Sequence, residues 1–188
     1  MSQEARLERV GTGLTPVTDG WFVVNAREAA WIRNDAFGLR CPFETSGPIA
    51  RAGTDVDERT FAQLGFHLAV LEPGQPGSLY HAEPSQEDFL VLCGECIAVI
   101  EEQERRLRAW DFVHCPPGTR HVFIGAGEGP CVLVLVGSRF GERGVRYPPS
   151  AQAAAFGAAV EIETESAKDA YAPFGHWRNE GPSNPAGL

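Results

Sequence analysis

Apolar residues in the middle of the chain occur in short runs separated by Gly and Pro, and the two ends lack this pattern. Short apolar runs bounded by turn residues are typical of β-strands. We expect strands at Leu64–Glu72, Ser78–Glu83, Asp88–Cys93, Cys96–Glu101, Arg105–Arg108, Phe112–Cys115, His121–Ile124 and Cys131–Val136. About eight short strands at regular spacing predict an antiparallel sandwich or small barrel. No helical period appears in this region, which excludes a helix bundle.

The two ends of the chain carry fewer and different signals. Trp21–Asn25 is an aromatic strand candidate, and Ala151–Val160 is an Ala-rich run that predicts a helix despite Gly157. A second short helix is expected at Ala167–Tyr171, and the final residues 178–188 are rich in Pro, Gly and Asn and are expected to be mobile. The predicted organisation is an N-terminal extension whose strand packs on the barrel (1–60), the barrel itself (61–140) and a partly helical C-terminal extension (141–188).

Composition places the chain among globular proteins of one domain. It has 188 residues, of which 43% are hydrophobic and 22% charged, and this balance excludes intrinsic disorder. The formal net charge of -9 disfavours nucleic acid and anionic membranes as partners. The longest apolar run, Cys131–Val136, is far shorter than the ~20 residues of a membrane-spanning helix.

Cysteine usage and the polar start of the chain bear on location. The first residues lack the apolar stretch of a secretory signal, and the 5 cysteines are an odd number. We therefore expect reduced thiols in a cytoplasmic protein, and the Arg-, Gly-, Ala- and Pro-rich composition indicates a bacterial source. Cys93 and Cys96 have the spacing of half a zinc site, but no second pair exists, so ordinary buried thiols are expected.

Two segments of the strand region hold residues suited to metal binding. His81 and Glu83 are two apart on one expected strand and therefore share a face. Glu87 begins the next strand after the break at Pro84, and His121 begins a later strand. If these residues converge inside a barrel, two imidazoles and two carboxylates form a good ligand set for Mn, Fe(II), Ni or Zn.

These segments resemble the two sequence motifs of the cupin superfamily. The first motif is G-x5-H-x-H-x3,4-E-x6-G, and the positions that match it are His81, Glu87 and Gly94. The second is G-x5-P-x-G-x2-H-x3-N, and the positions that match it are Pro116, Gly118 and His121. The resemblance covers about residues 64–137 and identifies the chain as a small single-domain cupin of the conserved-barrel type, an antiparallel β-barrel with jelly-roll topology.

The chain departs from these motifs at four positions. Glu83 replaces a His, Gly74 lies one residue too far upstream, Trp110 replaces a Gly and Gly125 replaces the terminal Asn. The change at Glu83 bears on function. Glu83 could be a fourth ligand, which would shift the metal preference toward harder ions. Alternatively its side chain turns away from the metal, where it would hydrogen-bond to a ligand or act as a general base.

The resemblance implies a divalent metal ion and a small-molecule ligand in the barrel. Residues His81, Glu83, Glu87 and His121 would hold the metal, and Glu83 or Glu87 would move a proton. Phe89 and Phe123 share strand parity with Glu87 and His121 and are candidates for the pocket wall. His67 lies on an apolar strand, either as a core or surface residue or facing the pocket.

The reaction itself stays open at this point. A metal-dependent oxygenase or isomerase-type enzyme is one hypothesis, and dioxygenases are the most common precedent in such families. The alternatives are a non-catalytic cupin that binds a sugar or another metabolite, and a barrel whose metal is purely structural. Cupins commonly dimerise, so we also expect a homodimer, with the Trp21–Asn25 strand added to a sheet edge.

Overall fold

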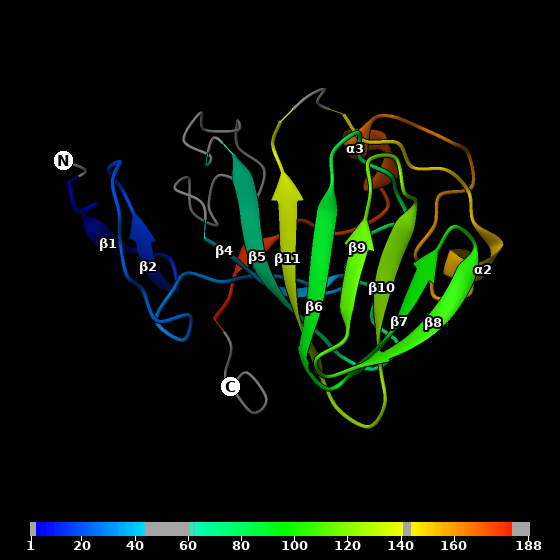
Figure 1. The fold of residues 1–188 in the computed structure, drawn as a ribbon, viewed down its shortest axis with the longest axis horizontal. Helices are drawn as coiled ribbons and strands as arrows, with labels where there is room; N and C mark the ends of the chain where they lie inside the picture. The colour runs from blue at the N-terminus through cyan, green and yellow to red at the C-terminus, as the bar shows by residue number, and fades with distance from the viewer. Residues whose placement is uncertain (1–2, 44–60, 62, 141–143, 182–188) are drawn as a thin grey trace.

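The computed structural model describes residues 3–43, 61, 63–140 and 144–181, and its strands form two opposed antiparallel sheets beside a small hairpin (Figure 1). The larger sheet has seven strands in the order β12-β3-β4-β5-β11-β6-β9, and the smaller has three in the order β10-β7-β8. The hairpin pairs β1 (Leu7–Val10) with β2 (Gly13–Pro16). The other strands are β3 (Ile32–Asn34), β4 (Gly38–Pro42), β5 (Leu64–Leu71), β6 (Glu87–Cys93), β7 (Glu95–Ile100), β8 (Gln103–Arg108), β9 (Phe112–Cys115), β10 (His121–Ala126), β11 (Cys131–Ser138) and β12 (Arg178–Asn179).

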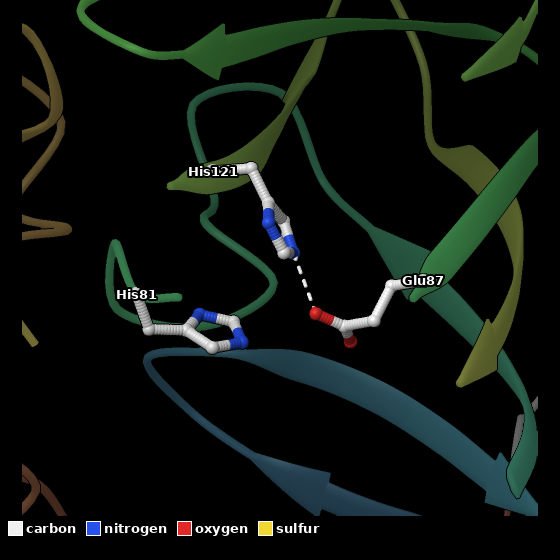
Figure 2. Close-up of side chains that lie close together, drawn as sticks. All are labelled: His81, Glu87 and His121. Carbon is white, nitrogen blue, oxygen red and sulfur yellow. Dashed lines mark ion pairs between the residues drawn. The ribbon is translucent and has the colours of Figure 1, made fainter. Parts of the chain in front are cut away.

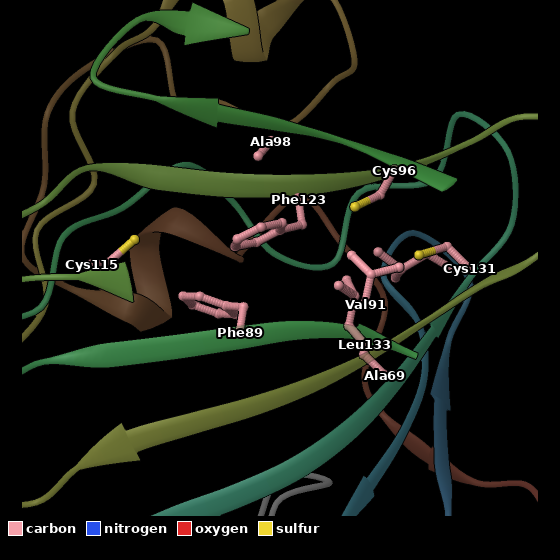
Figure 3. Packing of buried hydrophobic residues seen from close by; sticks show 10 residues of the cluster. Ala69, Phe89, Val91, Cys96, Ala98, Cys115, Phe123, Cys131 and Leu133 are labelled. Carbon is pink, nitrogen blue, oxygen red and sulfur yellow. The ribbon is translucent and has the colours of Figure 1, made fainter. Parts of the chain in front are cut away.

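The main core lies between the two sheets. Phe89 of β6 and Phe123 of β10 face each other across this space, with ring centroids 4.3 Å apart (Figure 3). The other buried members of the cluster are Ala69, Leu71, Val91, Cys96, Ala98, Cys115, Cys131 and Leu133. Alternate residues of each strand supply these side chains, as the two-residue period of a strand requires. The all-β fold predicted from the sequence is confirmed, and the described strands form a jelly roll of two separate sheets.

All but one of the expected strands in this region are confirmed. The segment Ser78–Glu83 is the exception, because it forms only isolated bridges, at His81 with His121 and at Ala82 with Arg146. The reason lies in its hydrogen bonds: the amide of Tyr80 donates to Ala158 O, while the amide of His81 donates to His121 O. Successive residues therefore bond to different segments, and no regular ladder develops.

The N-terminal part of the chain contains more strand than its sequence pattern predicts. The expected strand at Trp21–Asn25 is wrong, since only an isolated bridge joins Trp21 to Glu4. Strands β3 and β4 instead extend the larger sheet, because β4 pairs with β5. Residues 44–60, which complete the predicted extension, lie outside the described part.

The C-terminal part packs beside both sheets with little helix. The expected helices are confirmed but short, as α2 (Ala151–Ala154) and α3 (Ala167–Ala170). Each begins after a serine whose side chain accepts a hydrogen bond from the third amide that follows, as helix-capping serines do. Arg178–Asn179, expected to be mobile, forms β12 on β3, and residues 182–188 lie outside the described part. Within the described ranges, no helix is both long and apolar enough to cross a membrane.

Candidate metal centre and ligand cavity

The isolated bridge between His81 and His121 sets the geometry of the candidate site. The two residues exchange backbone hydrogen bonds, with N···O distances of 3.1 and 2.9 Å. Directly opposite residues in an antiparallel pair project their side chains to the same face. The two imidazole rings accordingly lie with centroids 4.8 Å apart (Figure 2).

Each histidine is oriented by a backbone carbonyl two residues before it. His81 Nδ1 lies 2.7 Å from Leu79 O, and His121 Nδ1 lies 3.0 Å from Thr119 O. A carbonyl oxygen can only accept, so Nδ1 carries the proton in both rings and Nε2 keeps its lone pair. This arrangement is typical of metal-binding histidines, in which one ring nitrogen binds the metal and the other donates to the protein.

Glu87 completes a cluster of three potential ligands. It is the first residue of β6, and its Oε2 lies 3.4 Å from His121 Nε2 (Figure 2). One ligand atom from each of His81, Glu87 and His121 lies within 4.8 Å of the other two. Among the described residues this is the only such group of three or more His, Cys, Asp or Glu. An imidazole–imidazole–carboxylate set of this size fits a divalent metal ion.

Glu83 lies near this cluster without belonging to it. Its carboxylate accepts a hydrogen bond from Ser85 Oγ at 3.4 Å, and its side chain lines the same cavity as the three candidate ligands. Its backbone oxygen accepts from the amide of Gly118 at 2.7 Å, so it links the two motif segments. The structure thus brings together three of the four predicted ligands and places the fourth beside them.

A cavity of about 410 Å³ lies in front of the candidate ligands. The predicted pocket residues His67, Phe89 and Phe123 all line it. The sequence reading missed further lining residues, among them Arg40, Arg139, Tyr147, Tyr171 and Trp177. One signal for Arg40 was available, because it is the only charged residue in the otherwise apolar run Phe37–Phe43.

Burial dominates the electrostatics of this site. It raises the pKa of Glu87 to about 8, with a further contribution from the nearby carboxyl of Glu83, whose own pKa burial also raises. Burial lowers the pKa of His81 to about 3 and that of His121 below its ordinary value. Both histidines are therefore neutral near pH 7, which is the form that binds a metal.

These shifts predict how the stability of the metal-free protein depends on pH. About one unit or more above 6.5, the ordinary value for His, His81 and His121 are mostly neutral in both the folded and the unfolded chain. Glu87 is then protonated in the folded chain up to about pH 8 and ionised in the unfolded chain, where its ordinary pKa is 4.5. The folded chain then binds more protons, so the free energy of unfolding falls as pH rises from about 7.5 through 8.

Urea denaturation of chelator-treated protein across this pH range measures how the free energy of unfolding changes with pH, with Glu87→Gln as the control. Glutamine does not titrate, so the free energy of unfolding of the variant is expected to decrease much less over this pH range. An equal slope in the variant would show that other groups cause it.

Comparison with known proteins agrees with this geometry. Residues 67–137 match the family model described as a cupin domain. A search of curated proteins gives no match. Similar solved structures include a putative sugar phosphate isomerase from Acidithiobacillus ferrooxidans, at 23% identity and a TM-score of 0.45, covering 57% of this chain and 64% of that one.

Two further structures are similar over part of the chain. A sugar phosphate isomerase from a cupin superfamily, from Silicibacter pomeroyi, has 26% identity and a TM-score of 0.43, over 49% of this chain and 65% of that one. A polyketide cyclase from Streptomyces resistomycificus has 14% identity and a TM-score of 0.49, over 69% of this chain and 82% of that one. The chain thus spans less than two thirds of either isomerase. Residues 67–137, which contain the motif-bearing strands and the His–Glu–His cluster, are thus similar to the cupin domain family.

Proposed function

We propose that this cupin binds one divalent metal ion through His81, Glu87 and His121 and acts on a small organic molecule in the adjoining cavity. The observation that carries the proposal is the convergence of three ligand atoms within 4.8 Å on the wall of a cavity of about 410 Å³. Ligand sites are commonly concave spaces of roughly 300–1,000 Å³. The cavity therefore has room for a metabolite beside the metal.

The ligand set favours an open metal site over a structural one. Structural zinc is closed by four protein ligands, whereas the cluster in the described residues has three. Two imidazoles and one carboxylate with open positions are also the ligands of non-haem Fe(II) oxygenases. When bound, the metal would supply Lewis-acid or redox chemistry to a substrate group that coordinates it. Oxygenase or isomerase-type chemistry is accordingly the function that we propose.

Glu83 is the residue that we propose for proton transfer. Its carboxyl lines the cavity, lies outside the ligand cluster and has a pKa raised by burial. A carboxyl whose pKa is raised holds a proton more readily, as a group that accepts and returns a proton in a reaction must. Ser85 Oγ donates to it and holds its orientation.

Glu83→Gln separates proton transfer from metal binding. We expect the variant to keep about one metal equivalent and to lose about 100-fold or more in turnover, since general acid–base catalysis contributes roughly 10²–10⁴. Metal is measured by elemental analysis, and turnover by oxygen uptake and product detection with a panel of chelating hydroxy acids, diketones and hydroxyketones. Loss of metal in Glu83→Gln would instead make Glu83 a fourth ligand.

A non-catalytic cupin that binds a metabolite is the second candidate, and the apolar walls formed by Phe89 and Phe123 favour it. Tight ligand binding without turnover by the metal-loaded protein would support it. The cytoplasmic location and the homodimer remain predictions from the sequence, and light scattering of the purified protein measures the oligomeric state.

A further inference from the structure

Arg40 places a positive charge on the wall of the cavity. It lies on β4, outside residues 67–137, and its side chain lines the same space as His81 and Glu87. Its Nη2 donates to Gly77 O, and its guanidinium carbon lies 5.1 Å from the centroid of the Trp177 ring. A hydrogen bond and a cation–π contact thus hold the guanidinium in place.

The positive charge of the Arg40 guanidinium affects the pKa values of two candidate ligands. Burial and then Glu83 raise the pKa of Glu87, and the positive charge of Arg40 opposes that rise. Burial and His121 lower the pKa of His81, and Arg40 adds to that effect. One part of the cavity therefore contains both the candidate ligands and a fixed cation.

Two phenols line the same cavity as Arg40 and His81. The ring of Tyr147 is 5.9 Å from the ring of His81 and 5.6 Å from the ring of Tyr171, measured between centroids. The amide of Leu79 donates to Tyr171 Oη at 3.1 Å, which fixes that hydroxyl at the cavity wall. Phenol and guanidinium N–H and O–H groups are the donors that an oxyanion needs.

These side chains come from the two parts of the chain that flank the matched cupin domain. Arg40 comes from β4, while Tyr147, Tyr171 and Trp177 come from the C-terminal part, all outside the matched residues 67–137. Strands β3 and β4, blue in Figure 1, lie in the same sheet as β5 and β11. The two ends of the chain thus complete one wall of the cavity.

The charges that line the cavity also favour an anion. Its described acidic and basic residues are Glu83, Glu87, Arg40 and Arg139, which balance when all are ionised. A divalent ion held by His81, Glu87 and His121 would leave the cavity with a net charge of about two positive, because neutral imidazoles add none. A buried excess of charge is costly unless a counter-charge neutralises it.

We propose that the cavity binds a small organic anion whose carboxylate or phosphate group is held by Arg40 and Tyr147 while its other end reaches the His81–Glu87–His121 centre. The contact with a metal rests on the proposed function, whereas the contact with Arg40 does not. Arg40 forms a planar fork of donors that matches both kinds of oxyanion. Tyr171 and Trp177 position these two groups.

Binding of three small probes tests this assignment by isothermal titration calorimetry. Succinate carries two carboxylates, phosphoglycolate carries a phosphate and a carboxylate, and succinamate replaces one carboxylate of succinate by a neutral amide. Each probe is titrated into wild type, Arg40→Gln, Arg40→Lys and Tyr147→Phe, as Zn(II)-loaded and as chelator-treated protein. Thermal unfolding and zinc content of each variant show whether it is folded and retains the metal.

We expect Zn(II)-loaded wild type to bind succinate or phosphoglycolate about 10- to 100-fold more tightly than succinamate, the size of a hydrogen bond to a charged group. The preferred probe tells whether the oxyanion is a carboxylate or a phosphate. Arg40→Gln is expected to lose that preference. Arg40→Lys should retain part of the preference, because lysine keeps the positive charge but lacks the planar set of N–H donors of a guanidinium. Tyr147→Phe, which removes only a hydroxyl, is expected to weaken the preferred probe severalfold.

Equal affinity of folded wild type and Arg40→Gln for the preferred probe would overturn the proposal. If Arg40→Gln does not fold, unchanged affinity in Tyr147→Phe and Arg40→Lys would overturn it. Failure of both succinate and phosphoglycolate to bind wild type at millimolar concentration would overturn it as well. If the protein binds no zinc, the metal proposal fails alone, and a probe affinity of chelator-treated protein that falls in Arg40→Gln would still support the anion site.

Discussion

Replacing His121 by Ala is expected to abolish stoichiometric metal binding. The imidazole is only 2% exposed, its Nδ1 is oriented by Thr119 O, and its Nε2 lies 3.4 Å from Glu87 Oε2. The substitution removes one of the three candidate ligands. Since losing even an outer partner of a metal ligand costs roughly 10–100-fold in affinity, we expect a loss of more than about 100-fold here.

Elemental analysis after loading with Mn, Fe(II), Ni or Zn measures this effect on protein purified without an affinity tag. His114→Ala is the matched control, because His114 is half exposed and pairs with Asp88 at 2.6 Å on the outer face. The control is expected to retain about one equivalent of metal. Equal metal content in the two variants would show that the ion binds elsewhere.

Replacing Gly125 by Ala is expected to destabilise the protein by about 3 kcal/mol, at the upper end of the cost of overpacking. A Cβ at this position would lie 2.2 Å from Glu72 O, a distance that no real contact reaches. The backbone is also held there, since the Gly125 amide donates to Gln75 O and Gly125 O accepts from the Gly74 amide. Relief of the clash therefore requires a shift of β10, which begins at His121.

Chemical denaturation measures this cost, with Gly129→Ala as the control. A Cβ at Gly129 meets nothing within 4 Å, so this variant is expected to lie within about 0.5 kcal/mol of wild type. A similarly small effect at Gly125 would contradict the packing described here. The clash also explains why this chain has Gly where the second cupin motif has Asn.

The strands of the central region could be predicted because each is a short apolar run ended by Gly or Pro. Cys131–Ser138 and Leu64–Leu71 are examples, and they pair along their full length. Ser78–Glu83 has the same local pattern but makes its hydrogen bonds to two different segments. Its conformation depends on partners distant in sequence, which a local pattern does not reveal.

The N-terminal strands could not be predicted from local patterns for the same reason. Trp21–Asn25 is a short apolar and aromatic run like that of a strand, yet Trp21 is 51% and Val23 is 79% exposed, and none of the described strands pairs with the segment. Strands β3 and β4 are short, and the stretch from Ile32 to Pro42 is interrupted by Arg33, Asn34, Asp35 and Arg40, so the segment resembles a loop. They form because the open edge of β5 accepts β4.

The candidate ligands could be predicted from the sequence because motif spacing reflects strand geometry. His81, Glu87 and His121 converge as expected, although whether a metal binds there is still a prediction. The positions of Glu83 and Arg40 could not be predicted in the same way. Ser85 holds the Glu83 carboxylate outside the cluster, and Arg40 reaches the cavity from a strand whose pairing the sequence did not indicate.

Crystallography of the Mn(II)-loaded protein with anomalous scattering tests the central claim most directly. We expect one strong anomalous peak bounded by His81 Nε2, His121 Nε2 and a Glu87 oxygen, at ligand distances of about 2.0–2.3 Å. We also expect coordination positions open toward the cavity, with the Glu83 carboxylate outside the ligand set. A peak at another site, or no peak in fully loaded crystals, would contradict the account.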